Sequence, residues 1–564
     1  MPKLLIDGLS VEAPPGATIL AAARMLGIDI PTLCHLEGSG PFTSCMLCLV
    51  KDTSSGRLLP ACSAQAEGDM VIETESGEVQ EARKDILELL LREHAGDCRA
   101  PCDLGCPAHA DIPAALRAVE RGQTREALHI IRQSIPFPAL ICGVCPAPCE
   151  SACRRGRFDA PVSIRLLFLH AADASREKQP SSSEPSRTPI TEPLVGQNST
   201  GKKVAVVGAG LAGLSAAYYL GLEGHACTVF SRGDLPAGAF RYGKPRGSSN
   251  APTEKTLIRD IFGSDLSVLD DLGVALNLNT GASGDITIRE LAGRFDSVIV
   301  ATGEKCLLEG DAIPGVFMCA AAFRPAGAVE GDARAFPRAA PGGILDTPRD
   351  ALEAARDAAE GRAVALSVHL FLGDRGPDAR KGEFNSRLGT LLDGELEEFL
   401  KDSAPYSRVS PSAGQGSSEG SGFDESEAVR EARRCLRCDC AKKSTCALRR
   451  YAARYGAGRN ISKNPERKRF ERTGGGPRAD HPSLQFEPGK CIKCGICVRI
   501  TESRGENPGL AFIGRGYGAR VGVPFGGPLS SALANTAKEC ARACPTGALA
   551  LVRSRTANPE AGDD

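Results

Sequence analysis

The sequence predicts a multidomain protein with α/β and α+β domains, in which a nucleotide-binding Rossmann unit is flanked by cysteine-rich modules. Three observations support this. The chain has 564 residues, enough for several domains. Residues 204–242 read as a strand, a glycine turn, a helix and a second strand. The 23 cysteines are grouped at short spacings, which in a chain without an export signal favours iron–sulfur or metal ligation over disulfides.

Composition excludes several classes of function. The net charge is −1 and Trp is absent, so neither a basic footprint nor a base-stacking surface indicates nucleic-acid binding. No apolar run reaches membrane-spanning length, and residues 1–16 lack the regions of a signal peptide. We therefore expect a cytoplasmic protein. The eight His are scattered and no nucleophile signature occurs, so no catalytic residue is predicted for a carbon substrate.

The Rossmann unit begins at the apolar run Val204 to Val207 and continues through a glycine turn into an alanine-rich helix. A second strand is expected at Ala226 to Phe230. Glycines let the backbone approach a pyrophosphate, and the N-terminus of the helix supplies free N–H groups. The candidate pyrophosphate-binding residues are Gly208, Gly210, Leu211, Ala212 and Gly213. The alternative is a glycine turn that only packs a helix on a sheet.

Residues 1–85 carry a first cysteine group. Strands are expected at Lys3 to Ile6, Leu9 to Ala13 and Met70 to Glu73, with a helix from about Thr18 to Leu26. The cysteines follow the spacing C-x10-C-x2-C-x13-C and are Cys34, Cys45, Cys48 and Cys62. Three thiolates from one loop and a fourth from a later segment suit a [2Fe–2S] cluster, whereas zinc usually uses two close CxxC pairs. The segment resembles the N-terminal ferredoxin domain of the large iron–sulfur subunit of complex I and of iron-only hydrogenases, which implies a β-grasp fold.

Residues 86–175 hold HAGDCRAPCDLGCPAHADIP and ICGVCPAPCESAC, separated by helical patterns at Ile112 to Arg121 and Arg125 to Gln133. This module resembles the N-terminal helical domain of the glutamate synthase small (beta) subunit and of dihydropyrimidine dehydrogenase, which implies two [4Fe–4S] clusters. By position, the resemblance implies one cluster on Cys98, Cys102 and Cys145 and another on Cys106, Cys149 and Cys153.

The module departs from that family at two places. The family's first cysteine is missing, but His94 stands at H-x3-C before Cys98, a spacing that is also seen in the complex I subunit. We expect His94 as the fourth ligand of that cluster, the alternative being a surface histidine at a helix end. The family often completes the other cluster with Glu or Gln, where this chain has Phe168. Its fourth ligand stays open between Cys142 and another side chain.

Residues 201–400 form the expected flavin domain, between linkers at 176–200 and 401–424 that are rich in Ser and Pro. The same glutamate synthase resemblance covers AGAFRYGKPR (237–246), SVIVATGEK (297–305) and the expected helix at 346–363, and it implies FAD. It implies further cofactor-binding residues at Ser231, Arg232, Arg241, Tyr242, Ala301, Thr302, Gly303 and Asp346. Ser231 departs from the family, because an acidic residue usually ends the second strand and holds the ribose. Between Gly303 and Asp346 the sequence has no second glycine fingerprint, so the inserted NADPH domain of those enzymes does not fit.

Residues 425–475 carry four cysteines within twelve residues, among Arg and Lys: Cys435, Cys438, Cys440 and Cys446. We expect a [4Fe–4S] cluster rather than zinc here, because every neighbouring module has the features of a redox-active domain. The basic side chains would offset the charge of a cluster.

Residues 476–564 resemble the two-cluster ferredoxin of complex I and hydrogenase subunits. Of its two C-x2-C-x2-C-x3-C runs, the first has Thr501 at its fourth place, and the second has Ala534 and Ala537 at its first two places. Because the last cysteine of each run serves the other cluster, one complete set remains, namely Cys491, Cys494, Cys497 and Cys544. Cys540 would be a remnant of the lost cluster. The isolated Cys227, Cys306 and Cys319 are expected to be buried structural thiols.

Together these modules predict an oxidoreductase with FAD, one [2Fe–2S] cluster and up to four [4Fe–4S] clusters. We expect an electron-transfer subunit of a larger complex, with other oxidoreductase subunits as partners, among them a NAD(P)H-oxidising flavoprotein and ferredoxin. One alternative is a self-sufficient NAD(P)H-dependent oxidoreductase that resembles the glutamate synthase small subunit. Another is a scaffold that carries clusters and binds no flavin.

Overall fold

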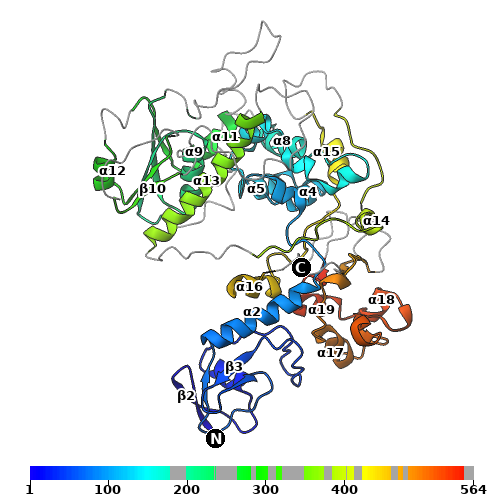
Figure 1. Ribbon diagram of the computed structural model, residues 1–564. Helices are drawn as coiled ribbons and strands as arrows, with labels where there is room; N and C mark the ends of the chain where they lie inside the picture. Colours follow the sequence, from blue (N-terminus) through cyan, green and yellow to red (C-terminus); the bar gives the residue numbers. More distant parts are fainter. Residues whose placement is uncertain are drawn as a thin grey trace. The chain divides into compact units, whose positions relative to one another are not determined.

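The computed structural model describes most of the chain, as two compact units (Figure 1). Described are residues 1–177, 199–233, 236, 263–280, 287–302, 313–319, 348–373, 384–401, 403–411, 422–458, 468–473 and 481–551. Unit 1 comprises residues 1–100, 380–403 and 436–564, and unit 2 comprises 101–379 and 404–435. The unit boundaries differ from the expected domains, because the 86–175 module is divided after Ala100 and the 425–475 module after Cys435.

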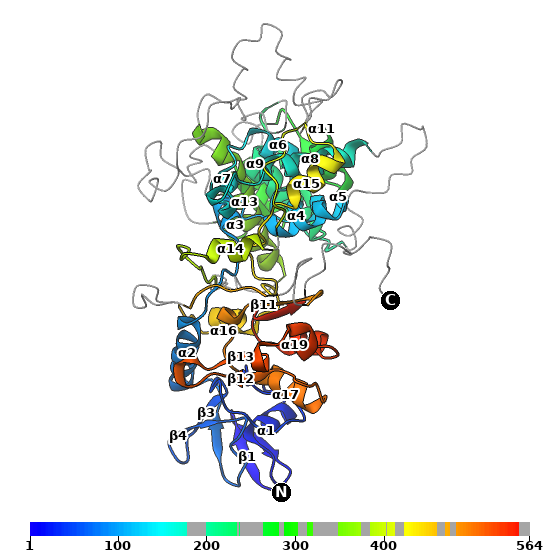
Figure 2. The ribbon, with the colours of Figure 1, turned by 90° about the vertical axis from the view of Figure 1, so that its right-hand side faces the viewer.

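A mixed five-stranded sheet begins unit 1, in the strand order β2-β1-β5-β3-β4. Its strands are β1 (Lys3–Ile6), β2 (Leu9–Glu12), β3 (Leu49–Asp52), β4 (Arg57–Pro60) and β5 (Val71–Glu73). Helix α1 (Ile19–Met25) begins after Thr18, whose side chain caps it by accepting a hydrogen bond from the amide of Ala21. Alternate residues such as Leu4 and Ile6 pack in one core with the buried residues of α1. Figure 2 labels α1 together with strands of this sheet. The expected strands and helix of this segment are therefore present.

The rest of unit 1 is helical, with two short antiparallel strand pairs. Its elements are α2 (Gly77–Arg92), α14 (Glu395–Leu400), α16 (Ala447–Arg454), α17 (Ile496–Ser503), α18 (Leu529–Ala532), α19 (Ala537–Ala543), the pair β11 (Leu484–Phe486) and β14 (Leu549–Leu551), and the pair β12 (Ala511–Ile513) and β13 (Arg520–Gly522). The fully buried Arg83 on α2 donates hydrogen bonds to the carbonyl oxygen of Leu49 on β3 and to the hydroxyl of Tyr455 beyond α16, both at 2.8 Å. Arg83 thus ties α2 to the sheet and to the C-terminal part of the unit.

Unit 2 contains a parallel five-stranded sheet in the order β10-β9-β6-β7-β8. Its strands are β6 (Lys203–Val207), β7 (Ala226–Phe230), β8 (Ala275–Asn277), β9 (Ser297–Val300) and β10 (Val316–Met318). Helix α9 (Leu211–Leu222) follows β6 and packs against α13 (Pro348–Leu372), which leaves Leu214 and Tyr218 of α9 buried. Apart from these, α12 (Ile288–Arg294) lies next to β9, and α11 (Gly263–Asp271) next to α9. The sheet and α9 form the Rossmann frame that the sequence predicts.

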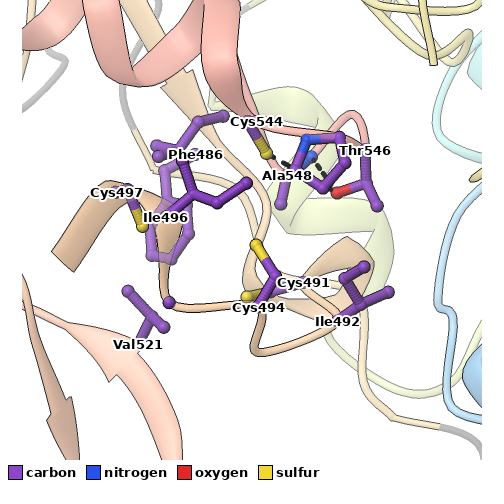
Figure 3. A pocket seen from close by; sticks show the side chains of 13 residues that line it. Phe486, Cys491, Ile492, Cys494, Ile496, Cys497, Val521, Cys544, Thr546 and Ala548 are labelled. Carbon is purple, nitrogen blue, oxygen red and sulfur yellow. Dashed lines mark hydrogen bonds between the residues drawn. The ribbon is translucent and has the colours of Figure 1, made fainter. Parts of the chain in front are cut away.

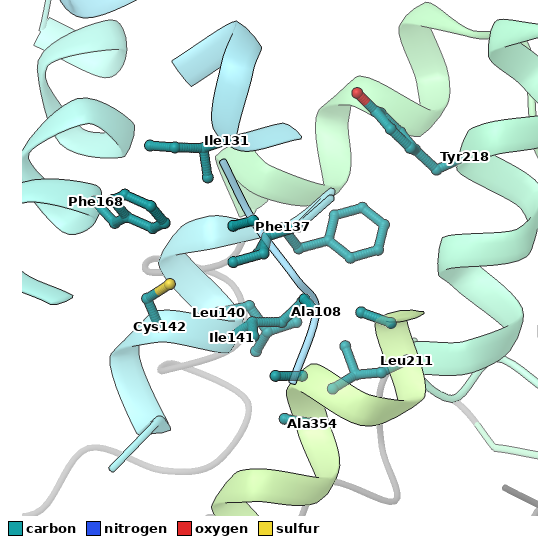
Figure 4. Packing of buried hydrophobic residues seen from close by; sticks show 14 of the residues in the cluster. Ala108, Ile131, Phe137, Leu140, Ile141, Cys142, Phe168, Leu211, Tyr218 and Ala354 are labelled. Carbon is teal, nitrogen blue, oxygen red and sulfur yellow. The ribbon is translucent and has the colours of Figure 1, made fainter. Parts of the chain in front are cut away.

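A set of short helices shares its core with this frame. They are α3 (Pro101–Gly105), α4 (Ile112–Glu120), α5 (Thr124–Arg132), α6 (Pro138–Val144), α7 (Pro148–Ser151), α8 (Ile164–Glu177) and α15 (Glu425–Ala432). Figure 4 shows Phe137, Leu140, Phe168, Leu211 and Tyr218 in this joint core. Residues from the cysteine-rich helices and from the Rossmann frame therefore bury one another within unit 2.

The expected second linker is partly structured. Arg408 donates hydrogen bonds to the carboxylate of Glu150 at 2.9 Å and to the hydroxyl of Ser163 at 2.7 Å, and the amide of Val409 donates to Glu431 at 2.8 Å. Residues 404–411 thus belong to the fold of unit 2. The first expected linker lies almost wholly outside the described residues.

Candidate cofactor sites

Cys34, Cys45, Cys48 and Cys62 come together beside the first sheet, and each is at most 4% exposed. Their thiols interact in two pairs. A hydrogen bond from Cys45 lowers the pKa of Cys34 to about 6, and one from Cys48 lowers the pKa of Cys62 to about 6. Thr43 and Met46 adopt left-handed backbone conformations, with φ of 54° and 55°, at the turns of the loop. Four buried thiols in two pairs fit a [2Fe–2S] cluster, in which each iron takes two thiolates.

A second group in unit 1 consists of Cys491, Cys494, Cys497 and Cys544, which line one cavity. Figure 3 shows them with the apolar residues Phe486, Ile496 and Val521, which line the same cavity. Burial raises the pKa of Cys494 to about 12 and raises that of Cys497 further, with contributions from the neighbouring thiolates. A buried thiolate needs compensating positive charge, so this donor set suits a metal-containing group.

These two groups are neighbours. The Nη2 atom of Arg499 on α17 donates a hydrogen bond of 2.6 Å to the carbonyl oxygen of Cys34. The thiolate of Cys34 adds to the rise in the pKa of Cys494, after burial, which places the two thiols within electrostatic range. The side chain of Arg499 thus brings a positive charge to the Cys34 group from the helix that carries Cys497, and the sequence reasoning did not single it out.

The residues of the altered ferredoxin run lie in the core of the same module. Thr501 is 1% exposed; its hydroxyl donates to the carbonyl oxygen of Val498 at 2.9 Å and accepts from the amide of Leu510 at 3.1 Å. Cys540 is fully buried, and its thiol lies 3.8 Å from the carbonyl oxygen of Cys497. Both side chains thus pack in the core of this module.

The H-x3-C pattern lies wholly in unit 1, just after α2. His94 and Cys98 are 7% and 6% exposed. The amide of Cys440 donates a hydrogen bond to the carbonyl oxygen of Cys98 at 3.2 Å. Cys446 and Cys438 also lie in unit 1, whereas Cys435 lies in unit 2. Cys102 and Cys145, which the resemblance grouped with Cys98, belong to unit 2.

Within unit 2 a different grouping appears. Burial raises the pKa of Cys142 well above the usual range, and the thiolates of Cys145 and Cys106 raise it further. The same two thiolates act on Cys149. Cys145 therefore lies with Cys106 and Cys149, a grouping that the resemblance did not give. Cys142, one of the two open choices for a fourth ligand, lies in the same group, while Phe168 is an apolar core residue (Figure 4).

Cys102, Cys153 and Cys435 pack, partly buried, against the core of unit 2. Two buried arginines hold this region: Arg155 follows Cys153, and Arg434 precedes Cys435. The Nη1 atom of Arg155 lies 3.5 Å from the carbonyl oxygen of Arg434, which it contacts as a donor. The C-terminal end of unit 2 is thus fixed against the segment that carries Cys153.

The glycine turn after β6 is a close-packed cradle. Gly208 has φ of 113°, and a Cβ atom there would lie 2.3 Å from the carbonyl oxygen of Ala301; a Cβ atom on Gly213 would lie 2.0 Å from the carbonyl oxygen of Gly208. Gly210 has open space where a Cβ would stand, at the N-terminus of α9. The buried hydroxyl of Thr302, at the end of β9, has no hydrogen-bond partner among the described residues. These features fit a dinucleotide phosphate group.

Ser231 and Arg232 directly follow β7 on the same edge of the sheet, where the amide of Gly233 donates to the Ser231 hydroxyl at 3.2 Å. Leu211 and Ala212 begin α9 and are buried. The other expected flavin residues, namely Arg241, Tyr242, Gly303 and Asp346, lie outside the described residues, as does Cys306. Cys227 and Cys319 are 3% and 1% exposed, as expected of structural thiols.

Three properties concern the described residues as a whole. None of their cysteines forms a disulfide. No three of their His, Cys, Asp or Glu side chains are arranged around a single metal ion. No helix in the described ranges is both long and apolar enough to cross a membrane.

Three family models match separate segments. Residues 3–77 match a 2Fe-2S iron-sulfur cluster binding domain, 91–180 match dihydropyrimidine dehydrogenase domain II with a 4Fe-4S cluster, and 203–242 match FAD dependent oxidoreductases. The chain thus combines iron–sulfur domains of both types with an FAD-dependent oxidoreductase segment.

Curated relatives agree with this. The NADPH-Fe(3+) oxidoreductase subunit beta of Geobacter sulfurreducens is 38% identical over 204 residues, 36% of this chain and 28% of that protein. The NADP(+)-dependent formate dehydrogenase subunit beta of Moorella thermoacetica is 38% identical over 222 residues, 36% of this chain and 29% of that protein. The glutamate synthase [NADPH] small chain of Bacillus subtilis is 35% identical over 216 residues, 38% of this chain and 40% of that protein. The chain spans less than half the length of these relatives, and over that part it resembles the glutamate synthase small chain and the beta subunits of two oxidoreductases.

Proposed function

We propose that the chain is an electron-transfer subunit of a larger oxidoreductase complex, and that it relays electrons between partner subunits or ferredoxin through FAD and iron–sulfur clusters. The observation that carries the proposal is the succession of three buried cysteine groups within unit 1. The first is the Cys34 group, the second is the Cys491 group, and the third contains Cys98, Cys440 and Cys446.

The groups follow one another at short range. Arg499 joins the first two groups, as described above. The second and third groups are joined at Cys544 and Cys446, because the thiolate of Cys544 contributes to the raised pKa of Cys446, after burial and after Cys440 and Cys98. Iron–sulfur clusters bound there would supply one-electron centres whose potentials depend on burial and hydrogen bonding. A series of neighbouring one-electron sites is what a relay requires.

The protein surroundings of these sites fit that role. The ion pair of Glu487 with Arg472 and Lys490 is buried, each side chain being at most 3% exposed. Together the three side chains hold a net positive charge inside unit 1. Buried positive charge stabilises thiolates and so favours the ligand form of the cysteines.

In unit 2, the glycine cradle at Gly208 and the N-terminus of α9 would bind the pyrophosphate of FAD. A flavin exchanges electrons singly or in pairs, so it would join a two-electron partner to the clusters. The sequence between Gly303 and Asp346 has no second glycine fingerprint. Electrons would therefore reach this chain from a partner subunit and not from a nicotinamide bound to it.

The second candidate is a self-sufficient NAD(P)H-dependent oxidoreductase. The similarity to the glutamate synthase [NADPH] small chain favours it. One experiment separates the two candidates. The full chain is purified without oxygen, and its visible spectrum is recorded after NADH, NADPH or dithionite is added.

We expect dithionite to bleach flavin and cluster absorbance, and neither nucleotide to do so alone. Bleaching by NADPH without a partner would overturn the relay and support the second candidate. A chain that retains iron but releases no flavin on denaturation would instead be a cluster-bearing scaffold. Adding a NADPH-oxidising flavoprotein then tests the relay directly, because bleaching should appear only when both proteins are present.

A further inference from the structure

Two distant segments meet at Cys98 in unit 1. The amide of Cys440 donates a hydrogen bond to the carbonyl oxygen of Cys98 at 3.2 Å. Ser386 holds the other side of Cys98, since its amide lies 3.4 Å from the Cys98 sulfur and its carbonyl oxygen accepts from the Cys98 amide at 3.0 Å. Cys98 is therefore held by backbone contacts at its amide, carbonyl and thiol, and the contact at its carbonyl comes from the four-cysteine motif at 435–446.

Cys446 belongs to the same place. It caps the N-terminus of α16, where its sulfur accepts from the amide of Arg449 at 3.4 Å. Burial raises the pKa of Cys446 to about 11; the hydrogen bond from the amide of Arg449 opposes this rise, and the thiolates of Cys440 and Cys98 add to it. Three buried thiols thus lie within electrostatic range of one another, and His94, four residues before Cys98, is buried as well.

The backbone packs closely against the thiol of Cys440. A Cβ atom on Gly547 would lie 2.2 Å from the sulfur of Cys440, so only glycine fits there. Lys490 is 2% exposed and pairs with Glu487. Burial alone would lower the pKa of Lys490, but the Cys440 thiolate and Glu487 together raise it. A buried cation therefore faces the thiol of Cys440.

Cys435 is held elsewhere, in unit 2. The preceding Arg434 is fully buried, with its guanidinium 2.7 Å from Glu431 and 3.1 Å from Asp159. Its carbonyl oxygen lies 3.5 Å from the guanidinium of Arg155, two residues after Cys153. The backbone at Cys435 is thus fixed beside the segment of Cys153, and Cys102 packs against the same core.

We propose that the 435–446 motif serves two iron–sulfur sites instead of one. Cys440 and Cys446 join Cys98 and His94 in a [4Fe–4S] site of unit 1, and Cys435 joins Cys102 and Cys153 in unit 2. After Cys98 the chain forms unit 2. It then returns to unit 1, where Cys440 and Cys446 complete the first site. The inference rests on the proposed function, since it requires that these groups bind clusters.

The test counts iron in the full chain, purified without oxygen, for single and paired Cys→Ala variants. Residues that share a cluster give non-additive losses, whereas residues of different clusters give additive ones. We expect Cys98→Ala and Cys440→Ala each to lose about four iron atoms, and the pair to lose no more than either alone. We expect Cys435→Ala paired with Cys440→Ala to lose about eight. Cys227→Ala, a buried cysteine outside every group, is the control and should retain all iron.

The opposite pattern would overturn the proposal. In that pattern, iron loss is additive for Cys98→Ala combined with Cys440→Ala, and non-additive for Cys435→Ala combined with Cys440→Ala. Where an alanine variant does not fold, the Cys→Ser variants give a second reading by electron paramagnetic resonance. Cys98→Ser, Cys440→Ser and His94→Cys should alter one shared signal, and Cys435→Ser should alter a different signal. If Cys435→Ser and Cys440→Ser alter the same signal, the inference is contradicted. A wild-type chain without iron would instead refute the proposed function itself.

Discussion

Arg499 and Cys34 are linked by a 2.6 Å hydrogen bond from the guanidinium to the carbonyl oxygen. The same guanidinium donates to the carbonyl oxygen of Gly40 at 2.8 Å and lies 5.2 Å from the ring centroid of Phe42. Arg499 also stands on the helix that carries Cys497. One cation is therefore shared by the loop of the first cysteine group and the helix of the second.

Replacing Arg499 by Leu should lower the reduction potential of a cluster on the Cys34 group. A nearby positive charge favours the more negative, reduced state, and one unit charge at this range is worth roughly 0.5–1.5 kcal/mol, or about 20–60 mV for one electron. A redox titration followed by electron paramagnetic resonance measures the shift. Arg499→Lys keeps the charge and should keep most of the potential. An equal shift in both variants would assign the effect to the lost hydrogen bonds and not to charge.

The glycine turn offers a matched pair of variants that separate folding from flavin binding. Gly208→Ala puts a Cβ atom into the backbone of Ala301 at a φ of 113°, so it should cost about 1 to 3 kcal/mol and also reduce the flavin content. Gly210→Ala meets nothing within 4 Å and should fold normally. Because Gly210 stands at the N-terminus of α9, its new methyl group should still weaken flavin binding. Flavin per chain and thermal unfolding are measured together; full flavin in Gly210→Ala would argue against a pyrophosphate at this position.

Two cysteines near the end of α19 should differ in their effect on iron. Cys544 lines the cavity with Cys491, Cys494 and Cys497, whereas Cys540 is fully buried in the core. Cys544→Ala should remove about four iron atoms. Cys540→Ala should leave the iron content unchanged and cost about 1 kcal/mol for the lost sulfur packing. Loss of iron in both variants would mean that Cys540 is a ligand and that the second ferredoxin cluster is retained.

The sequence predicted those elements whose signals are local. The run from Val204 through Gly213 becomes β6, the turn and α9, and the alternation at Lys3 to Ile6 becomes β1. Each pattern needs only its own neighbours to be read, because periodicity and glycine placement act within one or two turns.

What the sequence could not give is which distant segments meet. The family resemblance groups Cys98 with Cys102, and spacing groups Cys435 with Cys440; the boundary between the two units falls after Ala100 and after Cys435, between the members of each pair. The grouping follows from tertiary contacts, such as the hydrogen bond between Cys440 and Cys98, that no spacing encodes. The burial of Lys490 likewise could not be predicted from the sequence, because its ion pair with Glu487 is recognisable only in the fold, where both side chains are buried.

A pair of histidines in unit 2 should make the Rossmann frame sensitive to acid. The Nε2 atom of His225, just before β7, lies 3.0 Å from the Nδ1 atom of His369 on α13. The other nitrogen of His225 contacts the hydroxyl of Thr200 at 2.7 Å. Burial lowers the pKa of His225, and His369 lowers it further. Asp296 opposes these effects and Lys202 adds to them, while His369 itself lies 3.7 Å from Glu223.

Because the folded pKa of His225 lies below its unfolded value of about 6.5, the unfolded chain binds more protons than the folded chain as the pH falls below that value. The stability that neutral His225 provides is therefore complete above about pH 6.5 and is lost as the pH falls through the folded pKa. We expect amides of β6 and β7 to exchange hydrogen faster at pH 5 than at pH 7, after correction for the intrinsic rate. In His225→Gln this pH dependence should shrink, because the amide side chain cannot be protonated in this range. If the variant keeps the full dependence, the acid sensitivity arises from other groups, and the histidine pair is not its cause.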